Sequence, residues 1–149
     1  MIEEHMLEWI KDYLKKRLKR QTRLNLRRKV DDLKALGWGN NLDRLAVIYR
    51  TDKYGKHFYT QHYETHLRKY KFKKFNLLEI GVGGYDDPYE GAYSLRMWRK
   101  YFPFANIFSI DIFDKSAFLE NRVKIFKGSQ VDQEFLEKVT QEIGELDVI

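Results

Sequence analysis

The sequence predicts an α/β protein built on a Rossmann-like parallel sheet with flanking helices. In the second half of the chain, short apolar segments typical of strands alternate with helical patterns, as they do in βαβ units. The first of these strands runs into glycines at Gly81 and Gly83, and the second ends in an acidic residue, Asp111. Open α/β folds bind ligands at this carboxyl edge of the sheet. The sequence therefore predicts a ligand site there.

Residues 1–36 are predicted to form a basic amphipathic helical arm. Its apolar residues recur every four positions, which is typical of a helix; they are Ile2, Met6, Ile10, Leu14 and Leu18, flanked by Trp9 and Tyr13. The arm has eleven Lys and Arg against six Asp and Glu, so it holds +5 of the net charge of +6. We favour an arm that packs its apolar stripe on the body or on a second copy. Contact with nucleic acid, a membrane or an acidic partner is the less favoured alternative.

Residues 37–149 are predicted to form lead-in helices and the N-terminal part of the Rossmann-like domain. The expected elements are helices over 42–49 and 60–70, a strand over 75–82, a helix capped by Ser94, strands over 107–112 and 122–126, a helix over 133–143, and the start of a fourth strand over 146–149.

Composition excludes several kinds of site. The chain has no cysteine, so disulfides, zinc–thiolate centres and a cysteine nucleophile are excluded. It shows neither a signal-peptide pattern nor an apolar run of about 20 residues, and we expect a cytoplasmic protein. His62 and His66 lie one helical turn apart, with His57 nearby, but without a supporting general-base motif we interpret them as surface or core residues and predict no metal ligands.

The glycine segment points to a particular kind of ligand. A dinucleotide-binding turn needs a third glycine three residues after Gly83, where Asp86 stands, which disfavours a nicotinamide-dependent oxidoreductase. A carboxylate at Glu79 and a roomy loop suit a cationic ligand with an amino-acid end. Asp111 can accept hydrogen bonds from ribose hydroxyls, and polar residues at 128–132 follow the third strand, where an adenine edge would lie. The alternative is that these are ordinary turn residues.

Several motifs between Leu42 and Ser116 resemble a known family. They are Leu45-Ala46-Val47-Ile48-Tyr49-Arg50-Thr51-Asp52-Lys53-Tyr54-Gly55-Lys56-His57, Tyr59-Thr60 with Tyr63, Leu78-Glu79-Ile80-Gly81-Val82-Gly83-Gly84-Tyr85, Gly91-x-Tyr93-Ser94-Leu95-Arg96-Met97-Trp98, and Ile110-Asp111-Ile112-Phe113-Asp114-Lys115-Ser116. These motifs are similar to those of class I S-adenosylmethionine-dependent methyltransferases, in particular the macrolide-sugar O-methyltransferases of the mycinamicin and macrocin type. The resemblance extends more loosely to Gln130 and Asp132 and does not cover residues 1–36.

The resemblance implies a function and a set of site residues. It implies O-methylation of a sugar or another small-molecule hydroxyl, with S-adenosylmethionine as cofactor and Mg²⁺ expected only in a full-length relative. Because the resembled family has a seven-stranded sheet, it also implies that this chain is an inactive N-terminal fragment, truncated after the start of the fourth strand, with its catalytic residues unknown. Carried over by motif, the methionine end would be held by Glu79, Gly81 and Gly83, the ribose by Asp111, the adenine by Ser129 and Gln130, and the cofactor would be covered by Tyr49, Thr51, His57 and Tyr59. Tyr59 and Tyr63 are equally compatible with the core. The alternative function is a non-catalytic cofactor-binding or interaction module whose basic helix recruits an anionic partner.

Overall fold

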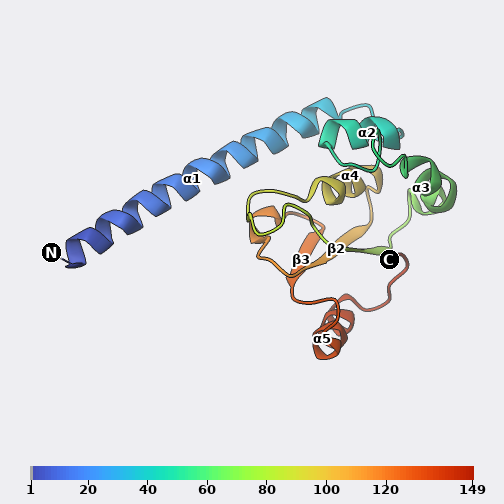
Figure 1. Cartoon of the computed structure of the whole chain (residues 1–149). Coiled ribbons are helices and arrows are strands. Elements are labelled where there is room, and N and C mark those ends of the chain that lie inside the picture. The colour runs from blue at the N-terminus through green and yellow to red at the C-terminus, as the bar shows by residue number, and fades with distance from the viewer. Residues whose placement is uncertain (1) are drawn as a thin grey trace.

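The computed structural model describes residues 2–149, including all their side chains except those of residues 2–5, 7 and 11. Its elements (Figure 1) are α1 Ile2–Lys34, α2 Leu42–Tyr49, α3 Thr60–Leu67, the 3₁₀ helix η1 Arg68–Tyr70, β1 Asn76–Ile80, α4 Tyr93–Tyr101, β2 Asn106–Asp111, the 3₁₀ helix η2 Ser116–Phe118, β3 Val123–Lys127 and α5 Gln133–Ile143. Within this described part, none of the helices combines the length and apolar character needed to cross a bilayer.

The sheet is parallel throughout, as predicted. Its strand order is β1-β2-β3, and the register places Leu77 beside Ile107 and Ile107 beside Val123. The expected fourth strand is present as a single parallel bridge between Val148 and Leu77, on the edge of β1 that β2 leaves free. β1 ends at Ile80 rather than at the expected position 82 because Gly81 adopts a positive φ of 90°. A strand needs negative φ values, so it cannot continue through this residue.

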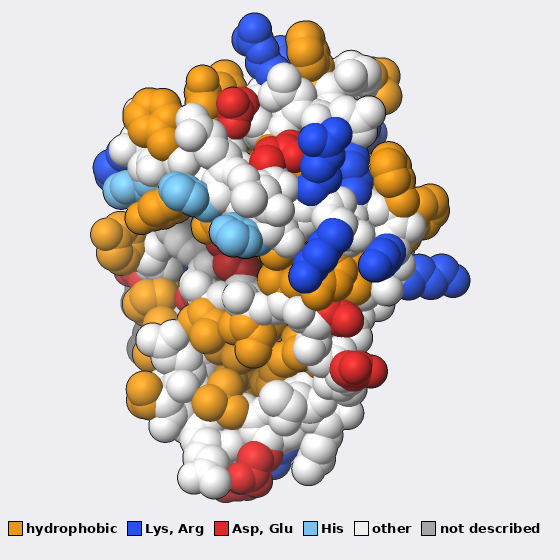
Figure 2. Space-filling view, turned by 90° about the vertical axis from the view of Figure 1, so that its right-hand side faces the viewer, with side chains coloured by type: hydrophobic (Ala, Val, Ile, Leu, Met, Phe, Trp, Pro, Cys, Tyr) orange, Lys and Arg blue, Asp and Glu red, His pale blue; other side chains and the backbone are white. Residues whose placement is uncertain are grey.

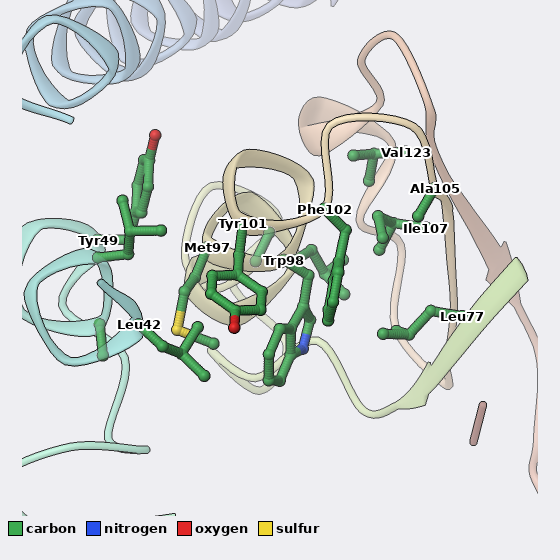
Figure 3. Packing of buried hydrophobic residues seen from close by; sticks show 14 of the residues in the cluster. Leu42, Tyr49, Leu77, Met97, Trp98, Tyr101, Phe102, Ala105, Ile107 and Val123 are labelled. Atoms are coloured by element: carbon green, nitrogen blue, oxygen red, sulfur yellow. The ribbon is translucent and has the colours of Figure 1, made fainter. Parts of the chain in front are cut away.

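Helices cover both faces of the sheet (Figure 1). On one face, the buried aromatic side chains of α4 pack between α2 and the strands (Figure 3), forming a cluster that includes Leu42, Tyr49, Leu77, Trp98, Tyr101, Phe102 and Ile107. On the other face, Val139 and Ile143 of α5 pack against Leu78 and Ile110. The alternation of side chains along β1 therefore feeds two separate cores, which confirms the expected α/β class.

One predicted helix cap is wrong. α4 begins at Tyr93, and the residue before it, Ala92, has a left-handed φ of 57°. Ser94 therefore lies inside the first turn, where its hydroxyl donates to a carboxylate oxygen of Glu79 at 2.8 Å. The local preference of serine for a helix N-terminus is overridden because the chain enters α4 through the left-handed turn after Gly91.

The two halves of α1 have different surroundings. The C-terminal half lies on the body, whereas the N-terminal half projects beyond it (Figure 1). The apolar stripe therefore does not pack on the body as the first alternative expected: Met6, Leu14 and Leu18 are 54%, 49% and 67% exposed. Ile2, the first member of the predicted stripe, lies outside the residues whose side chains are described. The N-terminal residues of the stripe are exposed because α1 is longer than the part of the body beside which it lies.

Candidate functional site

A hollow of about 440 Å³ lies at the carboxyl ends of the three strands. It unites residues from three separate strand ends, and its lining consists of Ile80, Gly81, Ile110, Asp111, Ile112, Gly128, Ser129, Gln130 and Val131. Four of the residues predicted to bind the cofactor thus meet in one place, namely Gly81, Asp111, Ser129 and Gln130. They converge because parallel strands end at the same edge of a sheet.

Asp111 is held rigidly at the mouth of this hollow. One carboxylate oxygen accepts the backbone N–H of Val82 at 2.8 Å, and the other accepts that of Phe113 at 2.9 Å. A carboxylate oxygen has two lone pairs, so each oxygen can still accept one further hydrogen bond. The side chain can therefore bind a pair of neighbouring hydroxyl groups while it ties β2 to the glycine loop.

The glycines of the loop after β1 have two distinct roles. Gly81 and Gly83 have positive φ values of 90° and 78°, and a Cβ atom at either would meet nothing within 4 Å, so their backbone faces open space that a ligand can occupy. Gly91 is different, because a Cβ atom there would overlap the carbonyl oxygen of Gly83. The loop closes on itself at that point, and the absence of a side chain permits the close approach.

The loop is also anchored by basic side chains. Lys115 is almost fully buried, and its ammonium donates to the carbonyl oxygens of Asp87 and Glu90 at 2.8 and 2.9 Å. From α1, Arg20 forms an ion pair with Asp87 at 2.6 Å, and Arg17 donates to the Tyr89 hydroxyl at 3.1 Å. The Tyr89 backbone N–H and the Arg20 guanidinium lower the pKa of Asp87. Two of the basic residues of the arm, Arg17 and Arg20, therefore bind the loop after β1 of the same chain.

Glu79 lies outside this hollow and lines a second one. That groove, of about 520 Å³, runs along the edge of β1 that carries Val148, and its other lining residues include Lys53, His62, Tyr63, His66, Ile80 and Trp98. The two hollows share Ile80. Figure 2 shows this side of the molecule, where hydrophobic side chains gather below a row of histidines.

The Glu79 carboxylate is surrounded by donors. One oxygen accepts the hydroxyl of Ser94 at 2.8 Å and pairs with the ammonium of Lys53 at 3.0 Å; the other accepts the indole N–H of Trp98 at 2.8 Å. Burial disfavours the Lys53 ammonium and is the largest single influence on it, but the charge and hydrogen bond of Glu79, together with Tyr63 and Asp52, outweigh it, so the pKa of Lys53 is raised. Sequence reasoning missed these partners. The available signal was the alternation of side chains along β1, which places Glu79 on the same face as Leu77, the face covered by α2 and α4.

The four predicted covering residues line neither hollow. Tyr49 is buried in the core, where its hydroxyl donates to Asp32 at 2.8 Å, and burial together with this hydrogen bond raises the pKa of Tyr49. Thr51 is buried, and its side-chain oxygen accepts the backbone N–H of Lys53 at 3.4 Å. Thr51 therefore does not contact the groove itself, but it fixes the backbone of Lys53, which lines the groove.

His57 and Tyr59 lead toward Glu79 through a row of aromatic rings. His57 stacks on Tyr59 with ring centroids 5.2 Å apart, and Tyr59 meets Tyr63 edge-on at 6.3 Å. Tyr63 in turn packs edge-on against Trp98 at 5.0 Å. The segment is thus coupled to the groove by packing. Among residues with described side chains, no group of three or more metal-ligating residues is gathered, so the structure assigns no metal ligands in this part.

The chain is similar to known proteins in both sequence and structure. No protein-family model matches it. It is 42% identical over 110 residues to the mycinamicin VI 2''-O-methyltransferase of Micromonospora griseorubida, a match that covers 73% of this chain and 28% of that protein. With the L-olivosyl-oleandolide 3-O-methyltransferase of Streptomyces antibioticus it shares 43% identity over 109 residues, covering 72% of this chain and 28% of the relative.

A solved structure shows the same relationship. The MycE methyltransferase of the mycinamycin biosynthetic pathway, in complex with Mg, S-adenosylhomocysteine (SAH) and mycinamycin VI, superimposes with a TM-score of 0.70 at 43% identity, over 72% of this chain and 30% of that one. The chain spans less than a third of the length of these proteins. The resemblance predicted from the motifs is confirmed: the chain belongs to the S-adenosylmethionine-dependent methyltransferases of the macrolide-sugar O-methyltransferase type.

Proposed function

We propose that this chain forms the cofactor-binding part of an S-adenosylmethionine-dependent O-methyltransferase. Its acceptor would be a hydroxyl group on a sugar or another small molecule, as the names of the relatives state for those proteins. The observation that carries the proposal is the hollow in which Gly81, Asp111, Ser129 and Gln130 meet. Their chemistry suits an adenosine group, and the glycine backbone leaves room for it.

Each residue of the hollow has a distinct task in this proposal. Asp111 accepts hydrogen bonds from the two ribose hydroxyls with the lone pairs that Val82 and Phe113 leave free. Ser129 and Gln130 present polar groups to the adenine edge. The backbone of Gly81 guides the ligand past Ile80, toward the groove that contains Glu79.

Methyl transfer requires more than cofactor binding. When bound, S-adenosylmethionine supplies an electrophilic methyl group, and the acceptor oxygen must be held in line with it and activated by a base or a metal ion. The catalytic residues stay unknown. We expect the 149-residue chain to bind the cofactor, and we propose Mg²⁺ and the methyl acceptor for full-length relatives.

Isothermal titration calorimetry of the 149-residue chain tests the proposal. We expect saturable binding of SAH and no binding of NAD⁺, because Asp86 stands where a dinucleotide-binding turn needs glycine. The Asp111→Ala variant, which loses the ribose contact, should bind SAH at least tenfold more weakly. Tighter binding of NAD⁺ than of SAH would refute the assignment and favour an oxidoreductase.

We also propose, as a second function, that the overhanging part of α1 is an interaction module whose partner is a second copy of this chain. Trp9, Tyr13 and Leu14 of this part are 66%, 51% and 49% exposed, and contiguous exposed apolar side chains of this kind mark interaction sites. In the C-terminal half, by contrast, acidic residues such as Asp31 are used in contacts with the body.

The charge pattern of the arm favours antiparallel pairing. In the sequence, Glu3, Glu4 and Glu8 precede a basic segment over 15–20. Two antiparallel copies bring the acidic end of each helix beside the basic segment of the other, whereas parallel copies would set like charges together. The same arrangement places the aromatic residues of one copy against those of the other, at the centre of the overlap.

Sedimentation velocity distinguishes the partners. We expect a dimer that Trp9→Lys converts to a monomer, while Leu26→Lys, a change at an exposed leucine on the part of α1 beside the body, leaves the dimer intact. A monomer at all concentrations would refute the proposal. Salt-sensitive binding of the monomer to DNA or to anionic vesicles would instead favour an anionic partner. The division of function between 1–36 and 37–149, and the cytoplasmic location, stay predictions.

A further inference from the structure

We propose that Lys53 recognises the carboxylate of the cofactor's amino-acid end, and that Glu79 positions Lys53 rather than binding the cofactor's ammonium group. The inference rests on the proposed function, because it takes S-adenosylmethionine as the ligand. It deepens that function by reassigning the contact at the end of β1. Glu79 becomes a positioning residue, and Lys53 becomes the residue that faces the ligand.

The first argument is that Glu79 already has a cation. Its carboxylate accepts from Ser94 and Trp98 and pairs with Lys53 at 3.0 Å. An ionised carboxylate has about four lone-pair positions, and these donors use three of them. A ligand ammonium that reached the remaining position would stand next to the Lys53 ammonium and be repelled by it.

The second argument is that Lys53 still has donors to offer. An ammonium has three N–H donors, and within the described part of the chain the structure shows one oxygen atom paired with it, on the Glu79 carboxylate. The Lys53 side chain is 16% exposed and lines the groove, so its remaining donors can reach a molecule bound there. The raised pKa of Lys53 keeps the ammonium charged at neutral pH.

The third argument is that the position of Lys53 is fixed. Its backbone N–H donates to the side-chain oxygen of Thr51 at 3.4 Å, and its carbonyl oxygen accepts the N–H of Thr60 at 3.3 Å. The ring of Tyr63 lies 5.8 Å from the ammonium, within the range of a cation–π contact. The side chain is therefore organised before any ligand arrives, which reduces the entropic cost of binding.

The fourth argument is the path of the ligand. The adenosine hollow and the groove meet at Ile80, so a ligand whose ribose lies on Asp111 extends past the end of β1 toward Lys53 and Glu79. Its amino-acid end carries both a carboxylate and an ammonium group. The Lys53 ammonium attracts the ligand's carboxylate and repels its ammonium, and this difference determines the orientation of the amino-acid end.

Calorimetry with three ligands tests the assignment on the full chain. SAH has the carboxylate, decarboxylated S-adenosylmethionine keeps the ammonium but lacks the carboxylate, and 5′-methylthioadenosine lacks the whole amino-acid end. We expect Lys53→Met to weaken SAH binding about 10- to 100-fold and to leave 5′-methylthioadenosine binding unchanged. The wild-type chain should prefer SAH to the decarboxylated ligand, and the variant should lose that preference.

Matched variants separate recognition from folding. Lys56→Met removes an exposed lysine from the same turn and should change none of the affinities, whereas Lys53→Arg should restore SAH binding in part. If Lys53→Met unfolds the chain by leaving Glu79 without its cation, the double variant Lys53→Met/Glu79→Gln removes both charges. That variant should still bind 5′-methylthioadenosine normally and SAH weakly.

Three outcomes overturn the inference, and one of them also overturns the proposed function. Unchanged SAH binding by Lys53→Met would show that Lys53 does not contact the ligand. An equal loss for all three ligands, in a variant that stays folded, would show that Lys53 only supports the fold. If the wild-type chain binds none of the three ligands, the assignment of the cofactor fails as well.

Discussion

Removal of Asp31 should destabilise the fold strongly, because this one carboxylate joins α1 to α2 and α4. Asp31 is 2% exposed, and its oxygens accept from Arg50 and pair with Arg96 at 3.3 Å. Asp31→Ala leaves the buried Arg96 with Asp32 at 2.8 Å and Glu120 at 3.6 Å. Breaking a buried pair costs about 3–5 kcal/mol, and we expect the lower end because these partners remain.

The lost Arg50 contact adds little, because the Arg50 side chain is 39% exposed and surface pairs contribute about 0–1 kcal/mol. We therefore expect Asp31→Ala to lower the free energy of unfolding by about 3 kcal/mol, a large share of the roughly 5–15 kcal/mol of a typical domain. Urea denaturation followed by circular dichroism measures this change. The control is Asp12→Ala, the same substitution at an exposed position of the same helix, which should cost less than about 0.5 kcal/mol.

A loss below about 1 kcal/mol for Asp31→Ala would refute the reasoning, since it would mean that Arg96 is satisfied by its other partners. Asp31→Asn offers an intermediate test, because the amide keeps one hydrogen-bond acceptor but loses the charge. We expect its cost to fall between those of Asp31→Ala and the wild type.

Three further predictions concern the glycine loop and the hollow beside it. Gly91→Ala should lower the urea midpoint sharply and abolish SAH binding, because its Cβ would overlap a backbone carbonyl; Gly55→Ala, which has a similar positive φ but open space, should cost only about 1 kcal/mol. Asp111→Asn should weaken SAH binding about tenfold in calorimetry, and unchanged affinity would contradict the ribose contact. Because the folded-state pKa of Asp87 is lowered from 3.8, its contact with Arg20 should persist above pH 3.8 and be lost as the pH falls through that lower value. An NMR titration of the loop amides that shows no transition below pH 3.8 would contradict this contact.

The sequence predicted the elements best where local chemistry and tertiary packing agree. α5 occupies the expected range because Asp132 caps its start with a hydrogen bond to the Phe135 backbone N–H at 3.1 Å, and Gly144 ends it with a positive φ of 78°. The Ser94 cap was wrong because the chain enters α4 through the left-handed turn after Gly91, which leaves the Ser94 hydroxyl free to donate to Glu79. The apolar period of α1 indicated a helix but could not say what covers its stripe.

The same contrast holds for the candidate site. Asp111 and Gln130 could be placed together because the ends of parallel strands share an edge, whatever the rest of the chain does. The pairing of Lys53 with Glu79 joins a turn to a strand, and no periodic pattern determines the distance between them. For Tyr49 two sequence signals disagreed. Its motif suggested a cofactor contact, whereas the helical period it shares with Leu45 indicated a buried core position, and in the structure Tyr49 is buried.

The hydrogen bond from Trp98 to Glu79 also gives the protein an optical reporter. In a single copy of the chain, Trp98 is 3% exposed, whereas Trp9 and Trp38 are 66% and 43% exposed, so in the monomer iodide should quench the emission of the latter two and leave that of Trp98. Because its indole N–H touches the carboxylate paired with Lys53, a change in that ion pair alters the field at the chromophore. The residual fluorescence would then follow events in the groove without an added label.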